Sequence, residues 1–158
     1  MPRTDSASRV IAASPTAVYA ALVDQDALAA WLAPAGMVGR FERFDLRRGG
    51  SYRMVLTYLD PSSSLPKSTA DTDVVEVRIL DLVPDARVVQ AVDFVADDPA
   101  YAGTMTMTWE VAALEAGTRV TITADNVPDA VSAQDHRAGL RSSLANLADY
   151  LTRARGVT

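Results

Sequence analysis

The chain has 158 residues, of which 49% are hydrophobic and 22% are charged, and this composition is typical of one soluble globular domain spanning residues 1–158. The net charge of −5 and the scattered arginines argue against nucleic-acid binding, which needs a clustered basic face. The lack of cysteine excludes disulfides and thiolate metal sites, and the single histidine, His136, excludes a multi-histidine zinc site within one chain.

The sequence also bears on location and on cofactors. No uncharged run approaches the roughly 20 apolar residues of a membrane span, and residues 1–5 lack the apolar stretch of a signal peptide. We therefore expect a cytoplasmic protein without a membrane span. No acidic run has the spacing of a calcium-binding loop, and Gly49-Gly50 lacks the following helix and Lys-Ser pair of a phosphate cradle. We expect neither a metal ion nor a cofactor.

The N-terminal part of the chain predicts one strand and two short helices. Residues 8–13 have strand character. Ser14 followed by Pro15 is typical of a helix start, with the serine as N-cap and the proline at the first helical position. Asp26 is expected to cap a second short helix that runs to Leu32.

The middle of the chain predicts six further strands. They cover residues 37–46, 52–59, 73–82, 87–95, 104–111 and 118–125, and residues 60–73 have the composition of a surface loop. The clearest alternation places Met105, Met107 and Trp109 on one face of a strand and the intervening threonines on the other. We expect the methionine and tryptophan face to be shielded from solvent.

The C-terminal part predicts one long, unbroken helix over residues 132–154. Leu140, Leu144, Leu147 and Leu151 are spaced by four, three and four residues and so share one helical face. Twenty-odd residues at 1.5 Å each give roughly 30 Å, enough to cross a small sheet. An amphipathic helix and a sheet with one apolar face each need a partner, so we expect this helix to lie on the sheet.

Several segments occur in an order that is typical of one superfamily. They are residues 14–22 (Ser-Pro-Thr-Ala-Val-Tyr-Ala-Ala-Leu), residues 28–31 with Pro34, residues 44–52 (Phe-Asp-Leu-Arg-Arg-Gly-Gly-Ser-Tyr), residues 117–121 (Gly-Thr-Arg-Val-Thr) and residues 136–151. Over about residues 8–154 the chain resembles START-like (SRPBCC) proteins, most closely the group related to the C-terminal domain of the activator of the heat-shock protein 90 ATPase. The resemblance implies an α+β helix-grip (START-like, Bet v-like) fold. In that fold a seven-stranded antiparallel sheet wraps around the C-terminal helix and leaves a cavity between them.

The resemblance and the alternation together predict the wall of that cavity. The expected lining is Trp31, Met54, Leu56, Tyr58, Met105, Met107, Trp109, His136, Leu140 and Leu144. Each of these residues alone would more often be an ordinary core residue, and the fold favours the cavity wall for the set. Trp31 and Tyr101 lie near expected loops, where they would either close the pocket mouth or plug the helix pair. Many relatives carry Gly-Trp where this chain has Gly139-Leu140, which would enlarge the cavity.

His136 is the one candidate catalytic residue. It precedes Leu140 by four residues and so lies on the helical face toward the sheet. An imidazole titrates near neutral pH and could transfer protons or orient a ligand, with Asp93 or Asp135 as candidate partners. The alternative is a partly solvated, hydrogen-bonded histidine in the first helical turn that has no such role.

Three functions remain open from the sequence. The first is binding of a small hydrophobic molecule, such as a lipid, a sterol or a polyketide-like compound, oriented by His136 or by a tyrosine. The second is an enzyme of the cyclase or dehydratase kind that uses the same cavity. The third is a chaperone-interacting module similar to the heat-shock protein 90 activator, which ranks lowest because the activator's separate N-terminal domain is missing here. The ligand's identity and a possible homodimer stay open.

Overall fold

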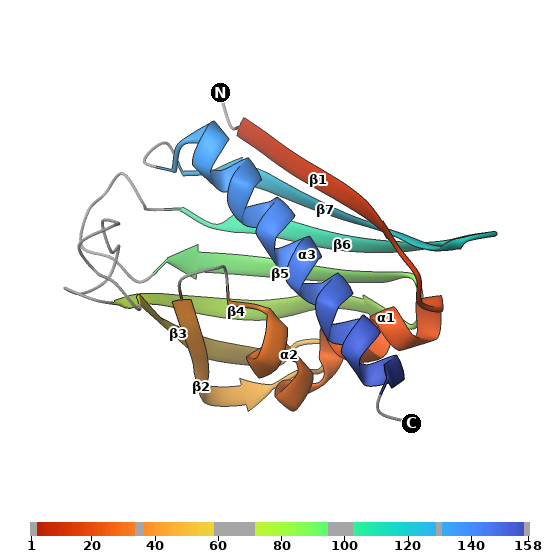
Figure 1. Cartoon of the computed structure of the whole chain (residues 1–158). Helices are drawn as coiled ribbons and strands as arrows, with labels where there is room; N and C mark the ends of the chain where they lie inside the picture. Colours follow the sequence, from red (N-terminus) through yellow and green to blue (C-terminus); the bar gives the residue numbers. More distant parts are fainter. Residues whose placement is uncertain (1–2, 34–36, 59–71, 95–102, 129–130, 157–158) are drawn as a thin grey trace.

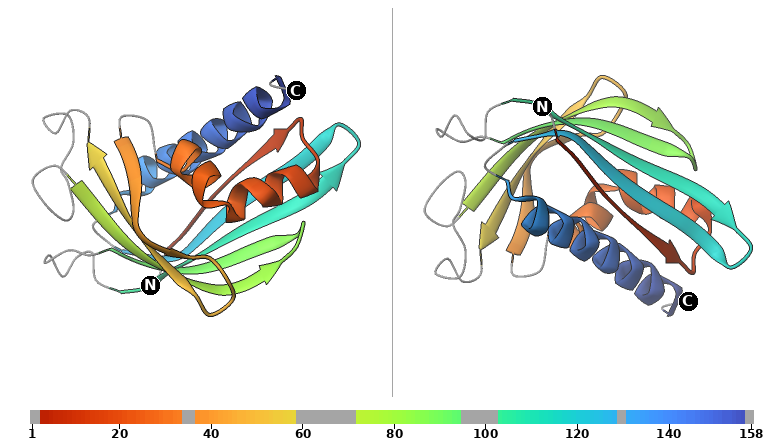
Figure 2. Two further views of the ribbon diagram at one scale, coloured as in Figure 1. Left: turned by 90° about the horizontal axis from the view of Figure 1, so that it is seen from below. Right: turned by 90° about the horizontal axis from the view of Figure 1, so that it is seen from above.

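The computed structural model describes residues 3–33, 37–58, 72–94, 103–128 and 131–156. Its elements are β1 (Arg3–Ile11), α1 (Pro15–Val23), α2 (Gln25–Trp31), β2 (Met37–Asp45), β3 (Ser51–Tyr58), β4 (Thr72–Val83), β5 (Arg87–Phe94), β6 (Met105–Leu114), β7 (Gly117–Val127) and α3 (Ala133–Gly156). The strands form one antiparallel, seven-stranded sheet in the order β1-β7-β6-β5-β4-β3-β2. The sheet curls around α3, and all three helices lie on its concave side (Figure 1, Figure 2). The predicted helix-grip fold is confirmed.

Strand β1 is longer than the sequence predicts. It begins at Arg3 and not at residue 8, and it pairs with β7 from Arg3 opposite Val127 to Ile11 opposite Thr118. The first half of β1 is polar. Backbone hydrogen bonds, and not side chains, hold a polar edge strand in the sheet, so its sequence shows no hydrophobic alternation. The extension matters for the site, because it brings Asp5 into the folded core.

The two short helices are each started by a capping side chain. Ser14 Oγ accepts a hydrogen bond from the backbone N–H of Ala17 at 3.1 Å, as predicted for α1. In α2 the cap is Asp24 and not Asp26, because the Asp24 carboxylate accepts from the N–H of Ala27 at 2.9 Å. Asp24 has an extended backbone and ends α1 while it starts α2, so the two helices share one junction residue.

The Ser14 cap provides a first test of this local structure. Ser14→Ala should lower the free energy of unfolding by about 1 kcal/mol, because the Ala17 N–H loses its side-chain acceptor at a helix end. Ser143→Ala, in the middle of α3, is the control and should cause no loss, because alanine is the better helix former. Urea unfolding of both variants measures the difference, and equal stability of the two would contradict the cap.

Helix α3 is continuous, as the leucine spacing predicts. Ser132 caps its first turn, with Oγ accepting from the N–H of Asp135 at 3.1 Å. All four leucines of the predicted face are buried, and removal of each from water is worth roughly 1.5–3 kcal/mol. The helix packs along β1 and against α1 and α2. None of the described helices has the length and apolar character that crossing a bilayer requires.

Candidate ligand-binding pocket

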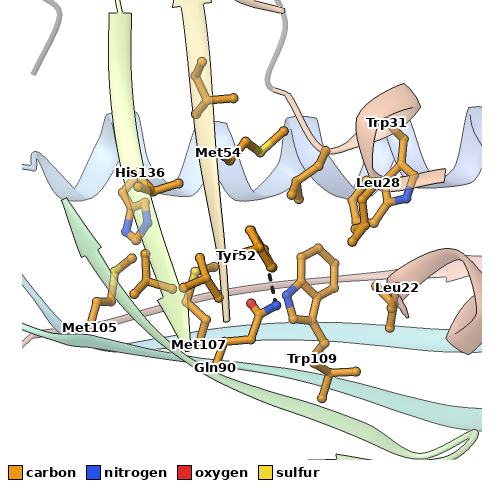
Figure 3. Close-up of a pocket in the computed structure, with 16 residues that line it drawn as sticks. Leu22, Leu28, Trp31, Tyr52, Met54, Gln90, Met105, Met107, Trp109 and His136 are labelled. Carbon is orange, nitrogen blue, oxygen red and sulfur yellow. Dashed lines mark hydrogen bonds between the residues drawn. The ribbon is translucent and has the colours of Figure 1, made fainter. Parts of the chain in front are cut away.

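A pocket of about 170 Å³ opens on the concave side of the sheet, between strands β3 to β6 and the three helices (Figure 3). Close-packed protein interiors leave few voids larger than a water molecule, so a space of this size is a distinct feature of the fold. Its lining is hydrophobic except at Tyr52, Gln90 and His136. The pocket therefore combines an apolar wall with a few polar groups, the usual make-up of a small-molecule site.

Seven of the ten residues expected in the cavity wall line this pocket. They are Trp31, Met54, Leu56, Met105, Met107, Trp109 and His136. Leu140 and Leu144 are outside the lining, and both are buried in the core cluster that also contains Trp31 and Trp109. The side chain of Tyr58 and the whole of Tyr101 lie outside the described residues, as does most of the expected loop at 60–73.

Strand β6 supplies one wall through its period of two. Met105 and Trp109 are buried, and Met107 is partly exposed, but all three line the pocket. Thr106 and Thr108, which alternate with them, are partly exposed. The register predicted from the sequence is therefore the one that the sheet adopts, with Met107 opposite neighbours on both β5 and β7.

The two tryptophans of the chain form one corner of the pocket. Their rings meet edge to face, with centroids 5.4 Å apart and planes at 81°. The Trp31 indole N–H also donates to the carbonyl of Ala21 at 3.0 Å. Trp31 is 2% exposed, so it is part of the buried wall and does not close a solvent-facing mouth.

Two polar side chains in the pocket are missing from the sequence-based lining. Tyr52 of β3 and Gln90 of β5 are both buried, and Gln90 Nε2 lies 3.5 Å from the Tyr52 hydroxyl, at the long limit for a hydrogen bond. Burial raises the pKa of Tyr52, and the hydrogen bond from Gln90 opposes this only in part, so the phenol keeps its proton at neutral pH. The sequence could have indicated Gln90, because it alternates with Val88 and Val92 on the face of β5 that lines the pocket.

His136 pairs with Asp5, which sequence reasoning does not place near it. The Nδ1 atom of His136 lies 2.8 Å from Oδ2 of Asp5. Neither expected partner contacts the ring: Asp93 accepts a hydrogen bond from Thr104 at 2.6 Å, and Asp135 is exposed. Asp5 is 131 residues away along the chain, so no local spacing links it to the histidine.

Asp5 is the centre of a buried polar cluster. It is 1% exposed, and its carboxylate also accepts from Arg3 Nε at 3.2 Å and from Arg3 Nη2 at 3.0 Å. Burial alone would raise the pKa of Asp5, but the hydrogen bonds from His136 and Arg3, together with the charge of Arg3, outweigh burial and lower it. The carboxylate is therefore ionised at neutral pH. Across the described ranges, no three His, Asp or Glu side chains are grouped so that they could hold a metal ion.

Comparison with known proteins gives matches over nearly the whole chain. The family model described as "Activator of Hsp90 ATPase homolog 1-like protein" matches residues 12–152. A crystal structure of a protein from Chromobacterium violaceum is 32% identical, with a TM-score of 0.82 over 94% of this chain and 96% of that one. A Rhizobium loti structure is 25% identical, with a TM-score of 0.73 over 95% and 97% of the two chains. A Rhodobacter sphaeroides structure, at 23% identity and a TM-score of 0.75 over 95% and 93%, shares the fold. None of the curated proteins matches.

Proposed function

The chain belongs to the family of activator of Hsp90 ATPase homolog 1-like proteins, within the START-like superfamily, and on that premise we propose that it binds a small, mainly hydrophobic molecule in the pocket beside α3. This fold commonly binds hydrophobic ligands. The observation that carries the proposal is the pocket itself, an apolar space of about 170 Å³ lined by buried residues of the sheet and the helices.

The volume of the pocket limits the size of the ligand that it can hold. An engineered apolar cavity of roughly 150 Å³ stays dry and holds benzene, and the pocket here measures about 170 Å³. This volume suits one aromatic ring or a short chain better than a complete sterol. Among the ligand types expected from the sequence, we therefore favour a small ring compound of the polyketide-like kind, or one ring of a larger molecule.

The rival functions depend on other observations. A chaperone-interacting role draws on the family's description alone, since no described surface feature specifies such a partner. An enzymatic role depends on His136 and its buried partner Asp5. Native mass spectrometry of protein purified from its own host gives the ligand directly, as a mass that leaves on denaturation.

A cavity-filling substitution tests the binding site. Val92 lines the pocket on β5, and Val92→Phe would place a ring in the space that the ligand needs. We expect the affinity for a single-ring probe such as indole or 4-nitroanisole to fall at least about tenfold, which corresponds to about 1.4 kcal/mol. Calorimetric titration measures the affinity, and thermal unfolding checks that the variant is folded.

The matched control is Val89→Phe on the same strand. Val89 is partly exposed, and the strand's alternation directs it to the opposite face of the sheet from Val88 and Gln90. This variant should bind both probes like the wild type. Equal losses in the two variants would mean that the probes bind elsewhere, and no saturable binding by the wild type would reject the proposed function.

A further inference from the structure

Binding of a purely hydrophobic molecule would not require the pair formed by His136, in the pocket wall, and Asp5, which contacts it. The His136 ring lines the pocket, and its side chain is 13% exposed (Figure 3). Behind the ring, the Asp5 side chain is fully buried and holds both Arg3 and His136. A buried ion cluster is costly to desolvate, so its position at the wall of an apolar pocket invites a functional explanation.

Asp5 determines which nitrogen of His136 carries a proton. An ionised carboxylate only accepts hydrogen bonds, so the contact at 2.8 Å requires a proton on Nδ1. In the neutral ring the lone pair is then on Nε2. Among the described residues, no hydrogen bond to Nε2 is formed, and the ring forms part of the pocket lining. The pocket is thereby provided with a hydrogen-bond acceptor that can also take up a proton.

The other polar groups complement this acceptor. The Tyr52 hydroxyl keeps its proton, and the amide of Gln90 contacts that hydroxyl at 3.5 Å, the long limit for a hydrogen bond. Both can therefore turn to a ligand, Tyr52 as a donor and Gln90 as donor or acceptor. A ligand that pairs with the hydrogen-bonding groups of the pocket needs a hydroxyl that donates to His136 and a second polar atom that contacts Tyr52 or Gln90.

Building on the proposed binding function, we infer that the ligand is a ring-sized molecule with a weakly acidic hydroxyl, a phenol or an enol, and that His136 Nε2 accepts the proton of that hydroxyl while Asp5 holds the ring in place. Asp5 is a positioning residue, because it acts through the imidazole. His136 is the residue that touches the ligand.

The proton transfer balances without any other reactant. The ligand O–H bond breaks, its proton forms the Nε2–H bond, and the electron pair stays on the ligand oxygen as a phenolate or enolate. The imidazolium that results faces the Asp5 carboxylate at 2.8 Å, which stabilises its charge. Arg3 is the second cation on that carboxylate, and the neighbouring Asp135 and Arg137 on α3 are exposed, where water screens them.

Two matched probes test this inference. The phenolate of 4-nitrophenol absorbs at longer wavelength than the phenol, and 4-nitroanisole is its methyl ether without a proton to give. At a pH where free 4-nitrophenol is mainly protonated, the wild type should bind it about tenfold more tightly than the ether and shift its absorbance to the phenolate band. A charge-assisted hydrogen bond is the physical reason for the preference.

Variants assign the effect to the pair. His136→Leu should lose both the absorbance shift and the tenfold preference for 4-nitrophenol over 4-nitroanisole, and thermal unfolding checks that the variant is folded. Asp5→Asn should weaken the shift with His136 still present, because a neutral amide stabilises the imidazolium less. Asp135→Asn removes a neighbouring exposed carboxylate and should behave like the wild type.

Each opposite outcome overturns a distinct claim. If the wild type binds both probes equally and without a shift, the pocket binds ligands but His136 does not accept their proton. A preference that survives in His136→Leu and disappears in Tyr52→Phe would assign the hydroxyl to Tyr52 and reject the inference. Failure of the wild type to bind either probe would reject the proposed binding function together with the inference.

Discussion

Trp109→Ala is expected to lower the free energy of unfolding by about 3–5 kcal/mol, the usual cost of deleting a large buried aromatic side chain. Trp109 is 4% exposed and packs edge to face against Trp31 at 5.4 Å. Its removal would merge the lost ring's volume with the existing pocket and leave Trp31 without its aromatic partner. Urea unfolding followed by circular dichroism measures the loss, since the variant also changes the fluorescence signal.

Trp109→Phe is the control for this prediction. It keeps a ring against Trp31 and creates a smaller cavity, so it should lose clearly less stability than the alanine variant. Indole should also raise the melting temperature of Trp109→Ala more than that of the wild type, because a ligand that binds only the folded state stabilises it by mass action. A loss below about 1 kcal/mol in Trp109→Ala would contradict the buried position of the ring.

The sequence predicts most of this fold because its signals are local and repeated. The leucines of α3 and the alternation of β6 each recur several times within one element, and the structure has both as predicted. Element ends are harder, since they depend on single residues. Asp24 and Asp26 are equally good caps by composition, and only the extended backbone at Asp24 makes that residue the cap of α2.

The polar part of the site is harder to predict than its apolar wall. The pairing of His136 with Asp5 joins the two ends of the chain across 131 residues, and it exists only because β1 begins as early as Arg3. No periodicity reports such a contact. Gln90 is a different case, because a glutamine at an inward position of an apolar strand could be recognised from the sequence.

Leu140 and Leu144 are a third case, because the sequence correctly predicts that they are buried but also places them in the cavity wall. Both leucines are on the buried face of α3, as the spacing indicates, yet among the described side chains of this helix the pocket lining includes His136 alone, at the N-terminal end. A helix of this length crosses the packed core as well as the pocket, so one helical face serves two purposes. Amphipathic spacing identifies burial but does not distinguish a core from a cavity.

Asp5→Asn is expected to lower the free energy of unfolding at neutral pH by about 3 kcal/mol, near the lower end for breaking a buried ion pair, since Arg3 is partly exposed. The control is Asp125→Asn on the neighbouring strand β7. Asp125 is exposed and accepts one hydrogen bond from Thr4 at 2.7 Å, so its loss should stay within about 0.5 kcal/mol.

The difference between the wild type and Asp5→Asn should also depend on pH, with a sign fixed by the lowered pKa of Asp5. Burial opposes that lowering, and the hydrogen bonds from His136 and Arg3 produce it. In the unfolded chain the carboxyl titrates near its ordinary value of 3.8, so its contribution is complete above that pH. Below it the unfolded state binds the proton first, and the stability advantage of the wild type shrinks until the folded-state pKa has been passed.

Glu76, whose pKa is also lowered, is common to both proteins and cancels in the difference. Urea unfolding of both proteins at a series of acidic pH values measures this, and a difference that stays constant through that range would show that Asp5 is not ionised in the folded protein.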